Sequence, residues 1–387
     1  MVLAKIYLNK LLYSFPAIAT TPLFIKILGK EFWTYLASAQ IIGGIFAVFI
    51  EANWRTMGIR DLTKATQDEL SLVSSKYVTQ RMFIFFISLP PMLMMCQIIP
   101  HHEAFLLFLA ATSTASMSLS IESFFTSRVK YNYVYWIEPI AKILINVLPL
   151  FWLSNKNELF YYFLGLIAVN IYIPLIILKY AENYSFKKVH MKIDISILKF
   201  AVSKLIATSY TTFPIPLMLY FNINDLYIYV ATDKLYRFIM TLYLPIIQFA
   251  QQKIHHEKNY VIEWSKIVYS TLITIPISMI SMEILKRFNI VPENFVPFDF
   301  MIYFVILSSV VNLNRICEVI LTDKTTSNQK STKIYIMSTI LFWSIFIFCI
   351  IFDSLTICII ACILVEIFGC FLRLKNIIIQ YKNVTNL

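Results

Sequence analysis

The chain has 387 residues, of which 59% are hydrophobic and 14% charged, and its mean hydropathy is +0.71. A soluble protein of this length could not bury so much apolar surface, so the composition excludes a soluble protein. The formal net charge of +11 would suit a nucleic-acid partner in a soluble protein. Here the positive charge is expected to flank membrane spans, and no nucleic-acid partner is predicted.

Apolar runs recur along the whole chain, and each is about as long as the ~20 residues that cross a bilayer core. The runs are continuous rather than alternating, so they predict helices and not barrel strands. The predicted spans, about twelve by the hydropathy rule, cover 6–27, 33–53, 80–99, 104–126, 133–153, 159–178, 198–221, 227–250, 264–285, 299–321, 334–352 and 355–373. The fold class is therefore predicted to be an all-α polytopic membrane protein.

Lysine and arginine concentrate in every second loop between these spans. Because such loops stay in the cytoplasm, both termini are predicted to be cytoplasmic. The loop at 179–197 lies at the midpoint and carries Lys187, Lys188 and Lys192. It separates six spans from six, which predicts an N-terminal bundle over 1–190 and a C-terminal bundle over 191–387.

The two predicted bundles share features of sequence. The stretch from Trp33 to Gln40 aligns with the stretch from Tyr227 to Lys234. This is either chance between two aromatic-rich helix starts or the trace of an internal duplication, which is common in transporters. Prolines also fall at corresponding places, in the first span and in the seventh, where they are expected to break the helix. They are Pro16, Pro22, Pro214 and Pro216.

Ionisable residues inside the predicted spans are the candidate functional groups, since each costs a few kcal/mol to insert and normally faces water or a partner. Two interpretations stay open for them. They are structural ion pairs or side chains that reach the interface, or they line a water-filled cationic cavity between the bundles. In the second case the groups that bind an anionic substrate are Lys142, Lys204, Lys234, Arg237 and Arg315. The carboxylates that couple transport to H⁺ or Na⁺ are Glu138, Asp233 and Glu51.

Other kinds of site have little support in the sequence. The chain has no nucleotide-binding GxGxxG or GxxxxGK[ST] pattern and no HExxH pattern. Its six cysteines form no CxxC pair, so neither a disulfide framework nor a zinc site is indicated. No cofactor, no metal and no enzymatic activity are therefore predicted.

Several short motifs resemble those of Wzx-type polysaccharide (O-antigen) flippases, in the multidrug/oligosaccharidyl-lipid/polysaccharide (MOP) exporter superfamily. In the first half these are the stretches at 21–29, 35–40 and 58–61, together with Glu51. In the second half they are the stretches at 229–234 and 244–248. The chain departs from the family where a further glycine often follows Leu28-Gly29, because Glu31 to Trp33 stand there.

The resemblance implies a flippase with two six-helix bundles in the bacterial inner membrane. It would move an undecaprenyl-diphosphate-linked oligosaccharide from the cytoplasmic to the periplasmic leaflet by alternating access. The implied partners are that lipid-linked oligosaccharide, the bilayer, the coupling ion H⁺ or Na⁺, and the polysaccharide polymerase machinery. The alternatives are a small-molecule exporter on the same fold and a membrane-embedded polysaccharide polymerase or acyltransferase.

Overall fold

The structure is a computed structural model whose described part is helical. The described residues are 2–51, 62, 65–99, 103–121, 136–147, 152, 153, 155–182, 202, 205–221, 223, 226, 227, 229, 230, 233, 234, 237, 276, 280, 283, 306, 307, 309–311, 313, 314, 317 and 329–385. Within these residues no strand occurs.

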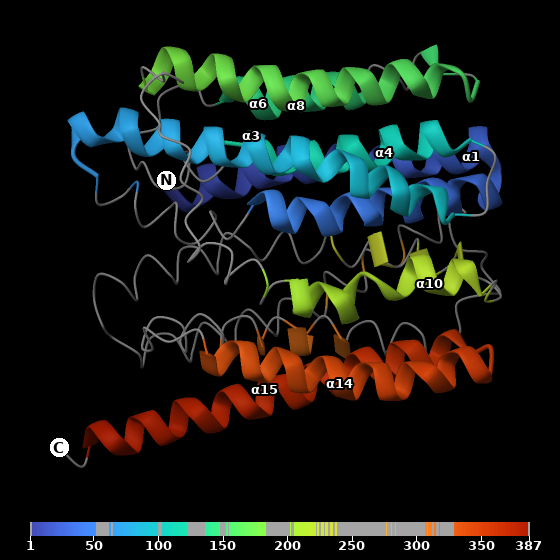
Figure 1. The fold of residues 1–387 in the computed structure, drawn as a ribbon, viewed down its shortest axis with the longest axis vertical. Helices are drawn as coiled ribbons and strands as arrows, with labels where there is room; N and C mark the ends of the chain where they lie inside the picture. Colours follow the sequence, from blue (N-terminus) through green and yellow to red (C-terminus); the bar gives the residue numbers. More distant parts are fainter. Residues whose placement is uncertain are drawn as a thin grey trace. The chain divides into compact units, whose positions relative to one another are not determined.

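The helices of the described part run in the order shown in Figure 1. Their bounds are α1 (Val2–Glu51), α3 (Gln67–Gln97), α4 (Ala104–Ser116), the 3₁₀ turn η1 (Met117–Leu119), α6 (Ile137–Val147), α8 (Glu158–Glu182), α10 (Pro214–Tyr220), α14 (Gln329–Ile351) and α15 (Leu355–Thr385). Five helical segments of the described part are long and apolar enough to cross a membrane. The predicted class, an all-α polytopic membrane protein, is confirmed. The predicted spans from 227 to 321 lie largely outside the described residues.

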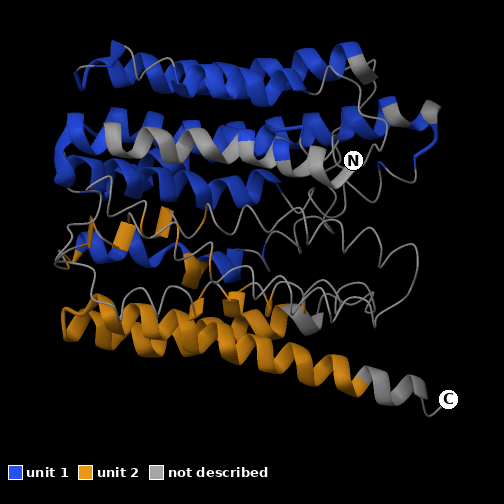
Figure 2. Ribbon diagram, turned by 180° about the vertical axis from the view of Figure 1, so that it is seen from behind, with its two compact units in different colours: residues 1–208, 212–220 blue, residues 209–211, 221–387 orange. Residues whose placement is uncertain are grey.

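The chain forms two compact units, coloured separately in Figure 2. Unit 1 comprises residues 1–208 and 212–220, and unit 2 comprises residues 209–211 and 221–387. The predicted boundary at residue 190 falls in the stretch 183–201, which lies outside the described residues, so that boundary stays a prediction.

Helix α1 holds the first two predicted spans and is interrupted at Gly29. This residue has φ 77° and ψ 161°, a conformation open in practice to glycine alone. Figure 1 draws α1 as two segments that run back along each other. The backbone is helical at Pro16 and Pro22, so the expectation that these prolines break the first span is wrong. The reversal lies at the glycine instead, because no other residue type adopts its dihedral angles cheaply.

We expect Gly29→Ala to destabilise the protein by about 1–3 kcal/mol, the usual cost of forcing a residue with a Cβ into such a region. The loss comes from the backbone alone, since a Cβ added at Gly29 would meet no atom within 4 Å. Thermal unfolding of the purified protein in detergent measures it. Gly44→Ala is the control, because that site is helical and equally open. An unchanged melting temperature for Gly29→Ala would show that the reversal does not need glycine.

Helix α3 begins at Gln67, well before the predicted start of its span near residue 80. Thr66 and Glu69 form a capping box, in which the Thr66 N–H donates to the Glu69 carboxylate at 3.0 Å. The same bond lowers the pKa of the exposed Glu69 carboxyl below its ordinary value. The early start places Arg81 inside the helix, where it is buried, although its charge suggests a loop or an interface.

In unit 2, α14 and α15 form a helical hairpin closed by a turn at 352–354, where Asp353 has a positive φ of 47°. The hairpin core contains a stack of Phe342 on Phe346, with ring centroids 5.5 Å apart. Helix α15 continues to Thr385, past the predicted end of its span at residue 373. Arg373 is therefore a helical residue, and it is buried.

Candidate functional site

Three buried charged side chains in the described part of unit 1, Arg81, Glu138 and Lys142, gather at the peptide group between Ser120 and Ile121. Arg81 of α3 donates from Nη1 to the Ser120 carbonyl oxygen at 3.0 Å. The N–H of Ile121, on the other side of the same peptide, donates to Oε2 of Glu138 at 3.2 Å. Oε1 of Glu138 lies 2.8 Å from Nζ of Lys142, one turn further along α6. One peptide thus connects a buried arginine to a buried ion pair.

This peptide needs side-chain partners because α4 ends just before it. The helix tightens into the 3₁₀ turn η1, and Ser120 then turns to ψ 143°, outside the helical region. A helix end leaves carbonyl and N–H groups without intrahelical partners, and burying them unpaired is costly. Arg81 and Glu138 satisfy both groups, and their opposite charges lie along the direction of the peptide dipole. The site is therefore specified jointly by α3, α6 and the end of α4.

Further polar contacts extend this cluster through unit 1. Asn146 donates to the Lys142 carbonyl oxygen at 2.7 Å and accepts from the Tyr162 hydroxyl at 2.8 Å. Asn170 of α8 donates to the Ser116 hydroxyl oxygen at 3.0 Å. All of these groups are buried. Hydrogen bonds between helices commonly stabilise membrane bundles. The Tyr162–Asn146 bond joins α8 to α6, and the Asn170–Ser116 bond joins α8 to α4.

In unit 2 the eighth predicted span carries the second candidate cluster. Nε of Arg237 donates to Oδ2 of Asp233 at 2.6 Å, and Nη2 donates to the Thr211 carbonyl oxygen at 3.2 Å. The carbonyl comes from the last helical residue before a turn at 212–213 and Pro214. The expected break in the seventh span is present in its described part. The Arg237 side chain is 42% exposed and that of Asp233 is 10% exposed, so the arginine is reachable while its carboxylate is covered.

The other predicted site residues have different positions. Lys234 is half-buried in the same turn as Asp233, and Glu51 is half-buried at the C-terminal end of α1. Lys204 and Arg315 lie outside the described residues. The structure therefore brings Glu138 together with Lys142, and Asp233 together with Arg237, each pair within one unit. Assignment of these residues to substrate or ion binding stays a prediction.

Sequence reasoning missed two buried arginines. The first is Arg81, which the predicted span start left at the edge of a loop. The second is Arg373, which lies over the Tyr335 ring with its Cζ 4.8 Å from the centroid and donates to the Asn314 side-chain oxygen. Nδ2 of Asn314 in turn donates to Glu366 at 2.5 Å. The length of the helices could have indicated both residues. When a helix extends beyond its apolar stretch, an arginine at the end of that stretch lies within the helix and packs against neighbouring helices.

Comparison with known proteins gives structural similarity at low sequence identity. No family model matches the chain, and no curated protein matches it. One similar solved structure is a MOP superfamily transporter from Pyrococcus furiosus, with a TM-score of 0.49, 9% identity, and coverage of 99% of this chain and 96% of that chain. Another is a mutant MATE protein, with a TM-score of 0.39, 12% identity, and coverage of 100% and 93%. Both TM-scores are below 0.5, so no conclusion about activity is taken from either protein.

Proposed function

We propose that the chain is a flippase that carries an undecaprenyl-diphosphate-linked oligosaccharide, an O-antigen repeat unit, across the bacterial inner membrane. Transport runs from the cytoplasmic to the periplasmic leaflet by alternating access of two bundles, with both termini in the cytoplasm. The fold supports a transport function. Charged side chains are costly inside a membrane, so a multi-pass helical protein that keeps them in its spans normally uses them to move or bind a substrate there.

The observation that carries the proposal is the cluster on the eighth span. Asp233, Lys234 and Arg237 supply two positive charges and one negative charge within about one helical turn. The Asp233 carboxylate bonds one edge of the Arg237 guanidinium through Nε and fixes its direction. The Arg237 side chain is nevertheless 42% exposed. An oriented, accessible guanidinium with a lysine beside it suits a diphosphate, which arginine binds through two parallel hydrogen bonds.

The remaining roles follow the same chemistry. Lys142, Lys204 and Arg315 complete the substrate-binding set, and Glu138, Asp233 and Glu51 are the carboxylates that couple transport to H⁺ or Na⁺. Glu138 and Asp233 each hold a cation of that set, at 2.8 Å and 2.6 Å. Protonation or ion binding at such a carboxylate would loosen its hold on the cation and change the charge offered to the substrate. The polymerase machinery is the proposed partner that receives the product.

We expect Arg237→Ala to reduce flipping at least about tenfold, the factor for losing one charge-assisted hydrogen bond. Flipping is measured in proteoliposomes by the enzymatic accessibility of a lipid-diphosphate-linked oligosaccharide. The same variant should fail to restore surface polysaccharide in a strain that lacks the gene.

Two variants control that experiment. Arg237→Lys keeps the charge but not the paired hydrogen bonds, so it should retain intermediate activity. Lys333→Ala removes an exposed cation near the start of α14 and should behave as wild type. Full activity of a well-expressed Arg237→Ala protein would overturn the proposal, and so would equal transport of a substrate that lacks the diphosphate.

A further inference from the structure

Unit 2 contains a buried polar cluster to which the proposed function assigns no role. Glu366 and Arg373 belong to α15, and Asn314 belongs to the tenth predicted span. Asn314 donates from Nδ2 to Oε2 of Glu366 at 2.5 Å. Its Oδ1 accepts from Nη1 of Arg373. One side-chain amide therefore links a buried carboxylate to a buried guanidinium and joins the tenth span to α15.

The two charged partners fix the orientation of the Asn314 amide. A carboxylate only accepts hydrogen bonds and a guanidinium only donates them, so Nδ2 faces Glu366 and Oδ1 faces Arg373. The positive end of the amide dipole then points at the negative charge, and its negative end points at the positive charge. Hydrogen bonds to ionised groups are about twice as strong as neutral ones. The amide is therefore held most firmly while Glu366 is ionised.

The helices pack closely around this amide. A Cβ added at Gly369 would lie 3.2 Å from Nδ2 of Asn314 and 3.3 Å from Nη1 of Arg373. The glycine thus leaves the room that the asparagine occupies beside α15. The ionisable side chains that belong to the cluster or lie within one turn of Glu366 on α15, other than Glu366 itself, are Arg373, Cys362 and Cys370 on α15, Cys317 on the tenth span, and Tyr335 on α14.

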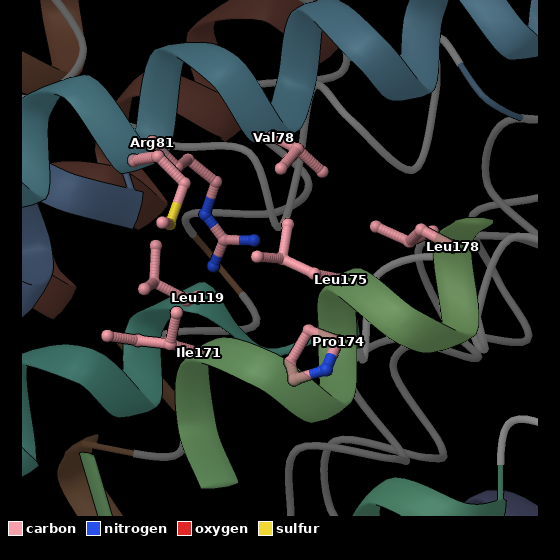
Figure 3. A pocket seen from close by; sticks show the side chains of 8 residues that line it. Val78, Arg81, Leu119, Ile171, Pro174, Leu175 and Leu178 are labelled. Carbon is pink, nitrogen blue, oxygen red and sulfur yellow. The ribbon is translucent and has the colours of Figure 1, made fainter. Parts of the chain in front are cut away.

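The buried arginine of unit 1 offers an instructive contrast. Arg81 also lies over a tyrosine ring, with Cζ 4.5 Å from its centroid. Figure 3 shows its guanidinium pointing from α3 toward α8, among apolar side chains such as Leu175. Arg81 is connected to Glu138 through the 120–121 peptide, which is part of the main chain. The connection in unit 2 runs instead through the Asn314 side chain, which can change rotamer without any movement of the backbone.

Glu366 lies about midway across the membrane. Helix α15 begins at Leu355, directly after the turn that closes its hairpin with α14. At ~1.5 Å per residue Glu366 is about 16 Å along the helix, against a hydrocarbon thickness of about 30 Å. The residue is 7% exposed. A carboxylate at this depth is costly to keep ionised, and such groups commonly belong to proton or ion pathways.

We propose that Glu366 binds a proton, and that this proton releases the Asn314 bridge between the tenth span and α15. The proton adds to a carboxylate oxygen and removes its charge. The hydrogen bond from Nδ2 then becomes a neutral one, of about half the strength. Arg373 loses a nearby negative charge at the same time, so its own burial becomes more costly. The asparagine can then leave its position, and α15 can move relative to the tenth span.

This carboxylate would join those assigned above to ion coupling, and that role rests on the proposed function. The binding of the proton does not, because it is measured without substrate. Infrared difference spectra of the purified full-length protein in nanodiscs follow the C=O stretching band of a protonated carboxyl as the pH falls. We expect a component of this band in wild type that is absent from Glu366→Gln. Glu31→Gln removes an exposed carboxyl and should keep that component. A band that is identical in wild type and Glu366→Gln would overturn the proposal.

The release of the bridge is measured with a native pair of thiols. Cys317 and Cys370 interact with each other, so oxidative cross-linking between them reports the separation of the tenth span from α15. The other four cysteines are replaced by serine. Glu366→Gln imitates the protonated state and should cross-link several-fold more slowly than wild type at high pH. The ratio of the two rates at each pH cancels the effect of pH on thiol reactivity, and it should approach one as the pH falls. A ratio that does not change with pH would overturn the proposal.

Asn314→Leu separates proton binding from its consequence. This variant keeps the carboxyl, so it should retain the infrared component that Glu366→Gln lacks. It has no bridge to release, so its cross-linking rate should match that of Glu366→Gln at every pH. An Asn314→Leu protein that cross-links as wild type does would show that the amide does not hold the two segments together, and would overturn the proposal.

Flipping in proteoliposomes tests the coupling role. An imposed pH gradient should accelerate wild type but not Glu366→Gln, while flipping down a substrate gradient persists in both. Equal acceleration of the two proteins would remove Glu366 from the coupling set. A wild-type protein that does not flip the lipid-linked oligosaccharide at all would contradict the proposed function, and the infrared and cross-linking results would still decide whether Glu366 binds the proton.

Discussion

Replacing Glu138 by alanine is expected to destabilise the protein by about 3–5 kcal/mol, the cost of leaving a buried charge without its partner. The side chain is fully buried, and it bonds both the Lys142 ammonium and the Ile121 N–H. Its loss removes a counter-ion and a hydrogen-bond acceptor in one step. Thermal or denaturant unfolding of the purified protein in a fixed detergent measures the change.

The double variant Glu138→Gln with Lys142→Met is the informative control. The glutamine oxygen can still accept from the Ile121 N–H, and methionine fills the volume of the lysine stem without its charge. Replacement of a buried ion pair by neutral groups is often close to neutral for stability, so this variant should unfold near wild type while Glu138→Gln alone does not. Additive effects of the two substitutions would show that the pair is not coupled. A stable double variant that fails to transport would show that the pair serves transport and not only folding.

Gly43→Ala is expected to be among the most destabilising single substitutions in unit 1, by about 1–3 kcal/mol or more, because it overpacks a close helix contact. A Cβ added at Gly43 would lie 2.0 Å from the carbonyl oxygen of Ala111 on α4. The obstacle is backbone, so the two helices must move apart. The α4 face there is made of small buried residues, Ala110, Ala111 and Ala115, as is usual where membrane helices approach closely.

Gly44→Ala is the matched control for this site too. It is the next residue in the same helix, and a Cβ there would meet nothing within 4 Å. Alanine is the better helix former, so Gly44→Ala should leave the melting temperature unchanged or raise it slightly. If both variants melt at the same temperature, the distance between α1 and α4 at Gly43 is larger than in the structure.

The helical class, and the spans that fall within the described part of the chain, were predicted better than the ends of those spans. Hydropathy finds the hydrocarbon-crossing part of a helix, whereas a helix ends where its backbone groups find other partners. The start of α3 is fixed by the Thr66–Glu69 capping box, ahead of its apolar run. The reversal at Gly29 likewise depends on the backbone freedom of one residue rather than on an apolar pattern. The prolines at 16 and 22 led to a helix break being predicted at the wrong residues.

The contacts within one helix of the candidate site were predictable from the spacing of residues along the sequence. Glu138 with Lys142, and Asp233 with Arg237, are four residues apart, and each pair forms an ion pair in the structure. The connection from Glu138 to Arg81 was not predictable, because it runs through the backbone of a third segment at the end of α4. Residues 39 positions apart meet there, and spacing along one helix carries no information about such a contact.

Helix α15 has a mechanical consequence. Its 31 residues make a rod about 46 Å long at ~1.5 Å per residue, against a hydrocarbon thickness of about 30 Å. One end must therefore project into the water as a stiff arm continuous with the last span. A tilt of the membrane-spanning part of α15 by a few degrees would displace the projecting end by a measurable distance. A spectroscopic label near Lys382 would report that sweep from outside the membrane, without disturbing the packed interior.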